Sequence, residues 1–152
     1  MNGARFSRDE ASFDDLKRHL RACDPTFMPP LSERLDIGDY SAKLAANATR
    51  FEAWSDHELI GLIAAYCNAA DKHAAYITSV SVLSQQQGKG IAADLLERCI
   101  VYIRKMGFKC IELEVNSGND AARALYARFG FNSTRITDSL MTMTIDLQKD
   151  AQ

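Results

Sequence analysis

The sequence predicts an α/β fold built on a mixed β-sheet flanked by helices, and the second half of the chain carries the main signals. Apolar residues recur with helical spacing after Gly90 and again after Asn119, whereas residues 110–115 alternate apolar and polar side chains as a strand does. A strand precedes the first of these helices and another follows the second. This order joins at least one parallel pair of strands through a crossover helix.

The first third of the chain is predicted to be mainly helical. Ser12 is expected to cap a helix that continues to about Ala22, since a serine directly before such a run is a preferred start. The pair Pro29-Pro30 cannot lie inside a helix, so the chain turns there. A second short helix is predicted from about residue 40 to residue 48.

The middle of the chain is predicted to form three strands. Residues 49–55 and 58–67 are apolar runs separated by Asp56-His57, which indicates a β-hairpin. Residues 76–83 form a third strand, which leads directly into a loop that contains glycine.

The two later helices have recognisable ends. The first is expected to run from Gly90 to Gly107, and the second to be capped by Gly118-Asn119-Asp120 and to end at Gly130. Residues 140–147 are predicted as the final strand.

Length and composition indicate one water-soluble domain spanning residues 1–152. The chain is 47% hydrophobic and 25% charged, and no apolar run approaches the roughly 18 residues of a membrane span. A formal net charge of -2 argues against a nucleic-acid partner. Residues 5–21 lack the apolar core of a secretory signal, so a cytoplasmic location is expected.

The cysteines do not predict a disulfide framework or a metal site. The four of them are scattered without a CxxC pair, and no histidine stands at metal-ligand spacing. His57 and His73 are expected to be exposed in turns, and Trp54 to lie in the core.

Residues 80–92 carry the strongest functional signal, because a strand there passes through a polar, glycine-containing loop into a helix. Glycines let the backbone approach an anion, and the free N–H groups of the first helical turn point toward it. A phosphate or pyrophosphate site is therefore predicted. Gly88-Lys89-Gly90 lacks the hydroxyl residue and the spacing of a P-loop.

A dinucleotide fingerprint is the competing interpretation of this loop. Residues 88–93 satisfy GxGxxA, and Glu112 follows at about the distance expected for the acidic residue of that motif. Only about 60 residues follow the loop, however, and these are too few for a doubly wound sheet.

Two motifs together resemble the GNAT superfamily of N-acetyltransferases. Gln87-x-x-Gly90-x-Ala92 matches the Q/R-x-x-G-x-G/A signature between strand and helix. Downstream, the segment 119–131, with Asn119, Ala122, Leu125-Tyr126 and Gly130-Phe131, resembles the second characteristic helix of that family.

The resemblance implies a twisted mixed sheet whose fourth and fifth strands splay apart to admit acetyl-CoA. On this basis the chain is an acetyl-CoA-dependent N-acetyltransferase that acts on a primary amine of a small molecule or peptide. The residues assigned by resemblance to the cosubstrate are Val80, Ser81, Val82, Gln87, Gly88, Lys89, Gly90, Ile91, Ala92, Ala93, Asn119 and Tyr126.

Catalytic roles are assigned in the same way. Glu114 is the candidate base that removes the amine proton, with Glu112 or a water relay as alternatives. Tyr126 is the candidate acid for the departing thiolate, and a backbone N–H near Val82 is expected to stabilise the oxyanion.

Other functions stay open from sequence alone. A catalytically silent acyl-CoA-binding module is one alternative, and a nicotinamide-dinucleotide oxidoreductase is another. The acceptor cannot be identified, and a homodimer rests on analogy with the family alone.

Overall fold

The computed structural model describes residues 3–148, in which seven strands form one mixed sheet with the order β1-β2-β3-β4-β5-β7-β6. The strands are β1 (Arg5–Arg8), β2 (Thr49–Ser55), β3 (Glu58–Tyr66), β4 (Ala74–Val82), β5 (Cys110–Asn116), β6 (Asn132–Thr137) and β7 (Leu140–Asp146). Among these strands, β4 and β5 form the one parallel pair. The mixed sheet predicted from the sequence is confirmed.

Four α-helices accompany the sheet within the same residues: α1 (Phe13–Cys23), α2 (Ile37–Asn47), α3 (Ile91–Lys105) and α4 (Asp120–Arg128). Short 3₁₀ turns occur at η1 (Asp24–Thr26), η2 (Leu31–Glu33) and η3 (Ser84–Gln86). Helix α3 connects β4 to β5, so it is the crossover helix that the sequence predicts. None of the helices described is long and apolar enough to cross a membrane.

Local capping fixes where the helices begin. Ser12 Oγ accepts a hydrogen bond from the backbone N–H of Asp15 at 3.1 Å, and the Asp15 carboxylate accepts one from the Ser12 N–H at 3.0 Å. Helix α2 begins three residues before its predicted start, because the Asp36 carboxylate accepts the N–H of Asp39 at 2.8 Å. The predicted cap of α4 within Gly118-Asn119-Asp120 is confirmed, and Asn119 is the capping residue.

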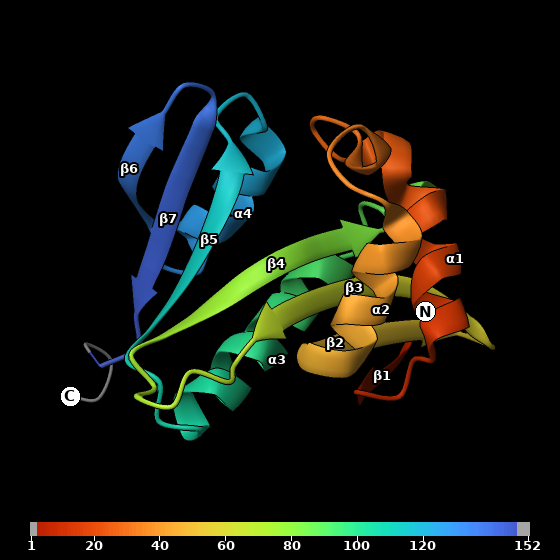
Figure 1. Cartoon of the computed structure of the whole chain (residues 1–152), viewed down its shortest axis with the longest axis horizontal. Helices are drawn as coiled ribbons and strands as arrows, with labels where there is room; N and C mark the ends of the chain where they lie inside the picture. Colours follow the sequence, from red (N-terminus) through yellow and green to blue (C-terminus); the bar gives the residue numbers. More distant parts are fainter. Residues whose placement is uncertain (1–2, 149–152) are drawn as a thin grey trace.

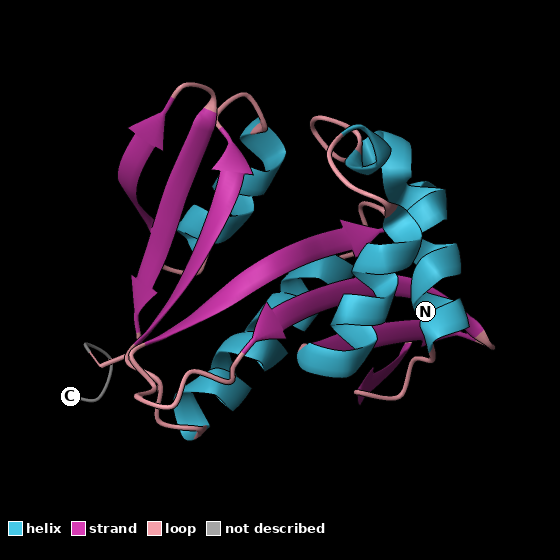
Figure 2. Cartoon of the chain, in the orientation of Figure 1, coloured by secondary structure: helices cyan, strands magenta, loops and turns pink. Residues whose placement is uncertain are grey.

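Helices cover both faces of the sheet (Figures 1 and 2). Helices α1 and α2 pack on the face of β2, β3 and β4 where Trp54, Leu59 and Leu62 are buried. Helix α3 packs on the opposite face, where a larger apolar cluster extends through β5 and β7 and includes Tyr126 of α4. Trp54 is in the core as predicted, and His57 and His73 are exposed.

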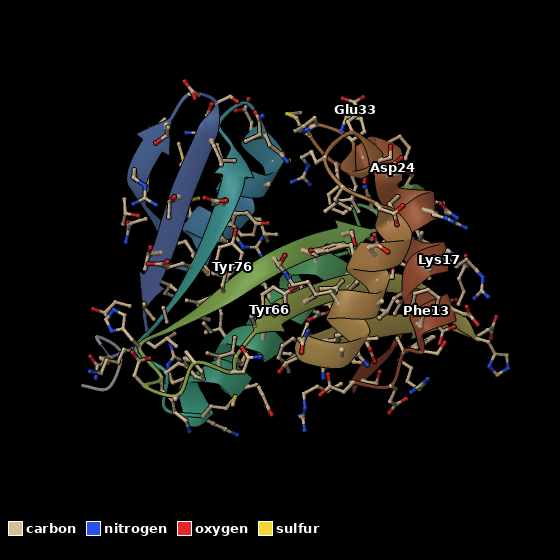
Figure 3. The ribbon with its side chains drawn as sticks, in the orientation of Figure 1. Phe13, Lys17, Asp24, Glu33, Tyr66 and Tyr76 are labelled. Carbon is tan, nitrogen blue, oxygen red and sulfur yellow. The ribbon has the colours of Figure 1, made fainter. Side chains whose placement is uncertain are left out.

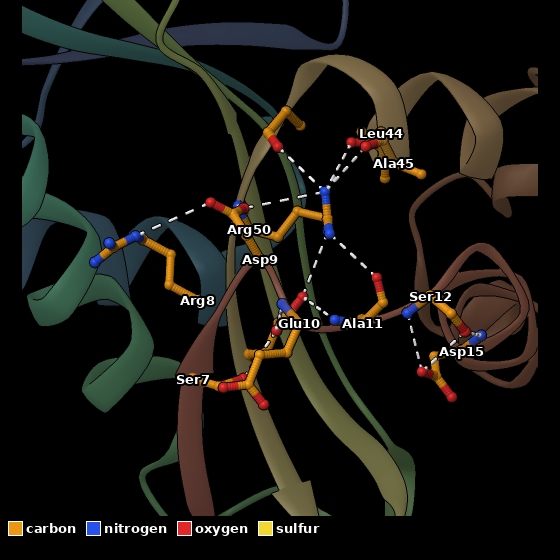
Figure 4. Close-up of polar contacts among 12 residues, drawn as sticks. Ser7, Arg8, Asp9, Glu10, Ala11, Ser12, Asp15, Leu44, Ala45 and Arg50 are labelled. Atoms are coloured by element: carbon orange, nitrogen blue, oxygen red, sulfur yellow. Dashed lines mark hydrogen bonds and ion pairs between the residues drawn. The ribbon is translucent and has the colours of Figure 1, made fainter.

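The first strand, β1, lies in a region that the sequence predicts as helical. It pairs with β2, and a buried ion pair secures the chain that follows it (Figure 4). The fully buried carboxylate of Glu52 accepts hydrogen bonds from the N–H groups of Glu10 and Ala11 at 2.8 and 3.0 Å. Arg50 lies 3.4 Å from the same carboxylate and donates to the Ala11 carbonyl at 3.1 Å. A contact across about 40 residues therefore decides this local structure.

The other unpredicted strand is β6. Every residue from Asn132 to Thr137 is exposed, so the strand has no buried face and no alternating pattern. It is held by antiparallel pairing with β7 at the edge of the sheet.

Candidate active site

The sheet opens between β4 and β5, as Figure 1 shows. Parallel pairing runs from Ala74 opposite Cys110 to Ile77 opposite Leu113 and ends there. Beyond that point β5 stays paired with β7 as far as Asn116, while β4 stays paired with β3. The backbone groups on the inner edge of residues 78–82 therefore face an opening instead of a neighbouring strand.

A β-bulge marks the point of divergence. Opposite β3 the register passes from Ile77 directly to Ser79, which leaves Thr78 as the extra residue. Tyr40 of α2 fixes this bulge because its hydroxyl donates to the Thr78 carbonyl at 3.0 Å and lies 2.7 Å from the Thr78 hydroxyl. Since Tyr40 gives its proton to the carbonyl, the threonine hydroxyl donates to Tyr40 in the second bond.

The opening holds a cavity of about 570 Å³, which we call the acceptor cavity. Its floor is formed by β4 and β5, and its sides by α4, the segment after α1 and the turn between β6 and β7. Of the residues predicted from the sequence, Val80, Glu114, Asn119 and Tyr126 line it. Glu112 does not line it, so Glu114 is the strand carboxylate that this cavity contains.

Glu114 is linked across the opening to Tyr76. The Tyr76 hydroxyl donates to Glu114 Oε1 at 3.2 Å, and Figure 3 marks Tyr76 near the point where the two strands separate. Burial, followed by the adjacent Glu114 charge, raises the pKa of Tyr76 well above its usual range. Tyr76 therefore stays protonated and remains a donor to the carboxylate.

Tyr126 is nearly buried, with 6% of its surface exposed, and lines the acceptor cavity from α4. Its ring packs against Phe131 at a centroid distance of 5.9 Å, which fixes its orientation. Burial raises the pKa of Tyr126 to about 12, so its hydroxyl keeps its proton at neutral pH.

A second cavity of about 200 Å³, which we call the loop cavity, lies at the start of α3. Gly88 and Gly90 have φ angles of 82° and 80°, a left-handed conformation that glycine adopts without strain. Gly90 is also the N-cap and has no side chain to bond the first helical turn. The N–H groups at this end are thus available to an anion.

Seven of the predicted residues line the loop cavity: Val82, Gln87, Gly88, Gly90, Ile91, Ala92 and Ala93. The Gln87 amide donates to the Val82 carbonyl at 3.3 Å, which folds the loop back onto the end of β4. Lys89 is not among the lining residues, and its ammonium group donates to the Gln86 side chain at 3.2 Å. Leu125 lines both cavities, so they adjoin along α4.

Two predicted residues have their side chains engaged elsewhere. Asn119 uses its side-chain oxygen to accept the N–H of Ala122 at 3.2 Å. Ser81 lines neither cavity, because its hydroxyl bonds to His19 Nε2 on α1 at 2.8 Å. Ser81 can therefore reach the opening only through its backbone.

Sequence reasoning missed several lining residues. Arg128 at the end of α4 brings a cation to the loop cavity. The acceptor cavity also includes residues 26–29, Arg34 and the turn at residues 137–140. Arg128 could have been predicted, because it stands between Tyr126 and Gly130 in the second motif. The others belong to segments without a recognisable motif.

Comparison with known proteins gives the same family as the two motifs. A family model described as "Acetyltransferase (GNAT) family" matches residues 13–131 of this chain. The chain is 38% identical over 56 residues to the N-alpha-acetyltransferase MAK3 of Arabidopsis thaliana, covering 37% of this chain and 30% of that protein. It is 28% identical over 105 residues to N-acetyltransferase 8F1 of Rattus norvegicus, covering 66% and 48% respectively. The matches thus span half or less of these curated relatives.

Solved structures confirm the fold. The ribosomal-protein-S18-alanine N-acetyltransferase of Escherichia coli superposes with a TM-score of 0.77 at 19% identity, covering 95% of this chain and 94% of that one. The PaiA N-acetyltransferase of Thermoplasma acidophilum, solved with coenzyme A, gives a TM-score of 0.74 at 18% identity and covers 93% and 99%. YncA of Salmonella typhimurium, a putative acetyltransferase solved with acetyl-CoA, gives 0.75 at 18% identity and covers 95% and 94%.

The family match covers well over half of the chain and includes both motifs, the crossover helix and the opening between β4 and β5. This protein belongs to the GNAT family of acetyltransferases.

Proposed function

We propose that the chain transfers an acetyl group from acetyl-CoA to the primary amine of an acceptor, and that the cosubstrate binds along the edge of β4. The observation that carries the proposal is the pair of adjoining cavities along the splayed strand, one at a helix N-terminus and one at a buried tyrosine. Acetyl-CoA has a diphosphate at one end of a flexible amide-containing arm and a thioester at the other. The two cavities suit these two ends.

The loop cavity is the proposed site for the diphosphate. Gly88, Gly90 and the first residues of α3 line it, the helix dipole of α3 favours an anion there, and Arg128 adds a full positive charge. Lys89, on the same loop, is exposed and able to change rotamer toward the ligand. A local positive site is thus available on a chain whose net charge is -2.

The edge of β4 is the proposed site for the amide-containing arm. Residues 78–82 have no strand partner on their inner side, so an arm with amide groups would pair with Val80 and its neighbours much as a strand does. The bulge at Thr78 turns the backbone at the thioester end. Val82 lines the loop cavity and Val80 lines the acceptor cavity, so the backbone N–H of Val80, instead of one at Val82, is our candidate for stabilising the oxyanion.

Glu114 is the proposed base, acting directly or through a bound water. An alkyl amine with a pKa of about 10 is mostly protonated at neutral pH and must lose its proton before attack. The amine nitrogen then bonds to the thioester carbonyl carbon, the carbon–sulfur bond breaks, and the sulfur leaves as a thiolate. Tyr76 holds Glu114 Oε1 and leaves the other carboxylate oxygen to face the amine.

Tyr126 is the proposed donor to the departing thiolate. A free thiol has a pKa near 8.5, below that of the buried phenol, so the hydroxyl acts mainly as a hydrogen-bond donor to the thiolate. The thiolate is expected to take its final proton from solvent or from the proton released by the amine. Because the phenol is protonated throughout the neutral range, this donor is present at every pH where the amine reacts.

Several broader expectations stay proposals. We propose that the chain is one domain, supported by the continuous sheet through residues 3–148, and that it works in the cytoplasm. The homodimer stays a prediction by analogy.

Isothermal titration with acetyl-CoA, beside NADH as a control, tests the cosubstrate. Micromolar binding of acetyl-CoA alone supports the proposal, and binding of NADH alone contradicts it. An acceptor screen that follows coenzyme A release then separates an enzyme from a silent binding module, which would bind acetyl-CoA without transferring the acetyl group to any amine.

A further inference from the structure

Arg34 brings an isolated positive charge to the acceptor cavity. It lies just after η2, is exposed, and lines the cavity opposite the strand that carries Glu114. Within residues 3–148 its guanidinium forms no hydrogen bond or ion pair. Its charge nevertheless acts on the cavity, because it partly offsets the rise in the pKa of Tyr76 and Tyr40 that burial causes.

The backbone around Arg34 is anchored, so its side chain starts from a fixed point beside the cavity. Leu31 is buried at 2% exposure, and the N–H of Arg34 donates to its carbonyl at 3.0 Å. The N–H of Ser32 donates to the Asp24 carboxylate at 2.7 Å, which ties η2 to the end of α1. Figure 3 marks Asp24 and Glu33 on this segment, across the opening from α4.

The cavity is limited in size on this side. The Met28 sulfur lies 4.0 Å from the place that a Cβ on Gly118 would occupy, so the segment after α1 approaches the turn after β5. The cavity of about 570 Å³ must also hold the acetyl end of the cosubstrate. A small acceptor fits this space better than a bulky one.

The charged residues that line the acceptor cavity favour one class of small acceptor over another. An arginine binds a carboxylate through two parallel N–H···O bonds, which fixes both position and orientation. Asp138 also lines the cavity and would suit a second amine, but a diamine acceptor would then lie beside the unpaired charge of Arg34. An acceptor with one amine and one carboxylate satisfies Glu114 and Arg34 together.

We propose that the acceptor is a small amine that carries a carboxylate close to the amine, of the amino-acid type, and that Arg34 binds this carboxylate while Glu114 faces the amine. This inference rests on the proposed acetyl transfer. Arg34 is thereby a specificity-determining residue.

Matched acceptor pairs test the assignment. Leucine, methionine and phenylalanine are each compared with their carboxamides, beside spermidine and tryptamine, by following coenzyme A release. We expect the free acids to be preferred in kcat/KM by about tenfold or more, a ratio typical of one charge-assisted contact. Arg34→Gln should bring that ratio to about one while leaving the KM for acetyl-CoA unchanged. Arg135→Gln, an exposed arginine on β6 away from both cavities, is the control and should keep the ratio.

The outcomes separate the two proposals. A wild-type preference for carboxamides, spermidine or tryptamine overturns the role of Arg34 and leaves acetyl transfer standing. An acid preference that survives Arg34→Gln does the same. Failure to acetylate any of these compounds, with acetyl-CoA bound, overturns the inference about the acceptor, and the broader acceptor screen then decides acetyl transfer separately.

Discussion

Tyr76 on β4, which is paired with Glu112, donates a hydrogen bond at 3.2 Å to Glu114 on β5, the first residue of β5 beyond the last pair, Ile77 and Leu113. The bond spans the start of the opening and orients the carboxylate into the acceptor cavity. Because Tyr76 is a hydrogen-bond partner of the proposed base, we expect its removal to change the pH dependence of the reaction.

Replacing Glu114 by glutamine should lower kcat/KM by about 10² or more, the usual size of a general-base contribution. Initial rates from about pH 6 to pH 9 should show the larger loss at the acidic end, where the amine most needs a base. Glu112→Gln is the matched control because Glu112 lies on the same strand but outside the cavity. A loss confined to Glu112→Gln would transfer the role of base to that residue.

Tyr126→Phe should reduce kcat by about tenfold or more and change the KM for acetyl-CoA by less than about twofold, since the hydroxyl acts on the leaving thiolate. Steady-state kinetics with saturating acceptor measure both values. Tyr102→Phe on α3, which lines neither cavity, should leave both unchanged. An unaltered kcat in Tyr126→Phe would remove the hydroxyl from the reaction.

The loop cavity should be sensitive to charge at Gly90. Asparagine and aspartate have nearly the same shape, and both tolerate a positive φ better than other residues with a Cβ. The φ of 80° therefore strains both variants similarly, and nothing lies within 4 Å of the added Cβ. Gly90→Asp should bind acetyl-CoA at least about tenfold more weakly than Gly90→Asn, because only aspartate repels the diphosphate. Equal affinities of the two folded variants by calorimetry would contradict a diphosphate at this loop.

Stability should fall with acid because of His19. The Nδ1 atom lies 2.8 Å from the Leu59 carbonyl and must donate to it, so neutral Nε2 accepts the Ser81 hydroxyl. Burial lowers the pKa of His19 from 6.5 to about 4. Between these values the unfolded chain binds more protons than the folded one, so stability rises with pH across this window.

We therefore expect the free energy of unfolding to lose about 2 kcal/mol between pH 7 and pH 5 through this group alone. Urea unfolding at the two pH values measures the loss. His19→Gln should lower the free energy of unfolding near pH 7 and reduce its drop between pH 7 and pH 5. His57→Gln, in the exposed hairpin turn, should leave that drop unchanged. A drop of full size in His19→Gln would show that another group causes it.

Elements whose signals are local were predictable. The hairpin at Asp56-His57, helix α3 and the cap of α4 depend on periodicity and on residues within a few positions, and the structure has them close to their predicted bounds. The glycine loop was predictable as well, because a strand, a polar segment with two glycines and a helix follow one another directly in the sequence.

Elements decided by distant partners were not predictable. Strand β1 depends on Glu52, about 40 residues away, and β6 depends only on pairing with β7. The same holds for the site, where Arg34 and Met28 reach the acceptor cavity from a segment without a motif.

The sequence by itself determined the family, the helices and strands from α1 to α4 and β7 but not β1 or β6, and the glycine loop before α3, because local patterns and short motifs encode these. Only the tertiary structure decided that Glu114 and not Glu112 lines the cavity, that Tyr76 holds it, and that Ser81 faces His19. The reason is physical: which side chains meet depends on strand register, on the bulge at Thr78 and on where β4 parts from β5. These features arise from packing between segments far apart in the chain.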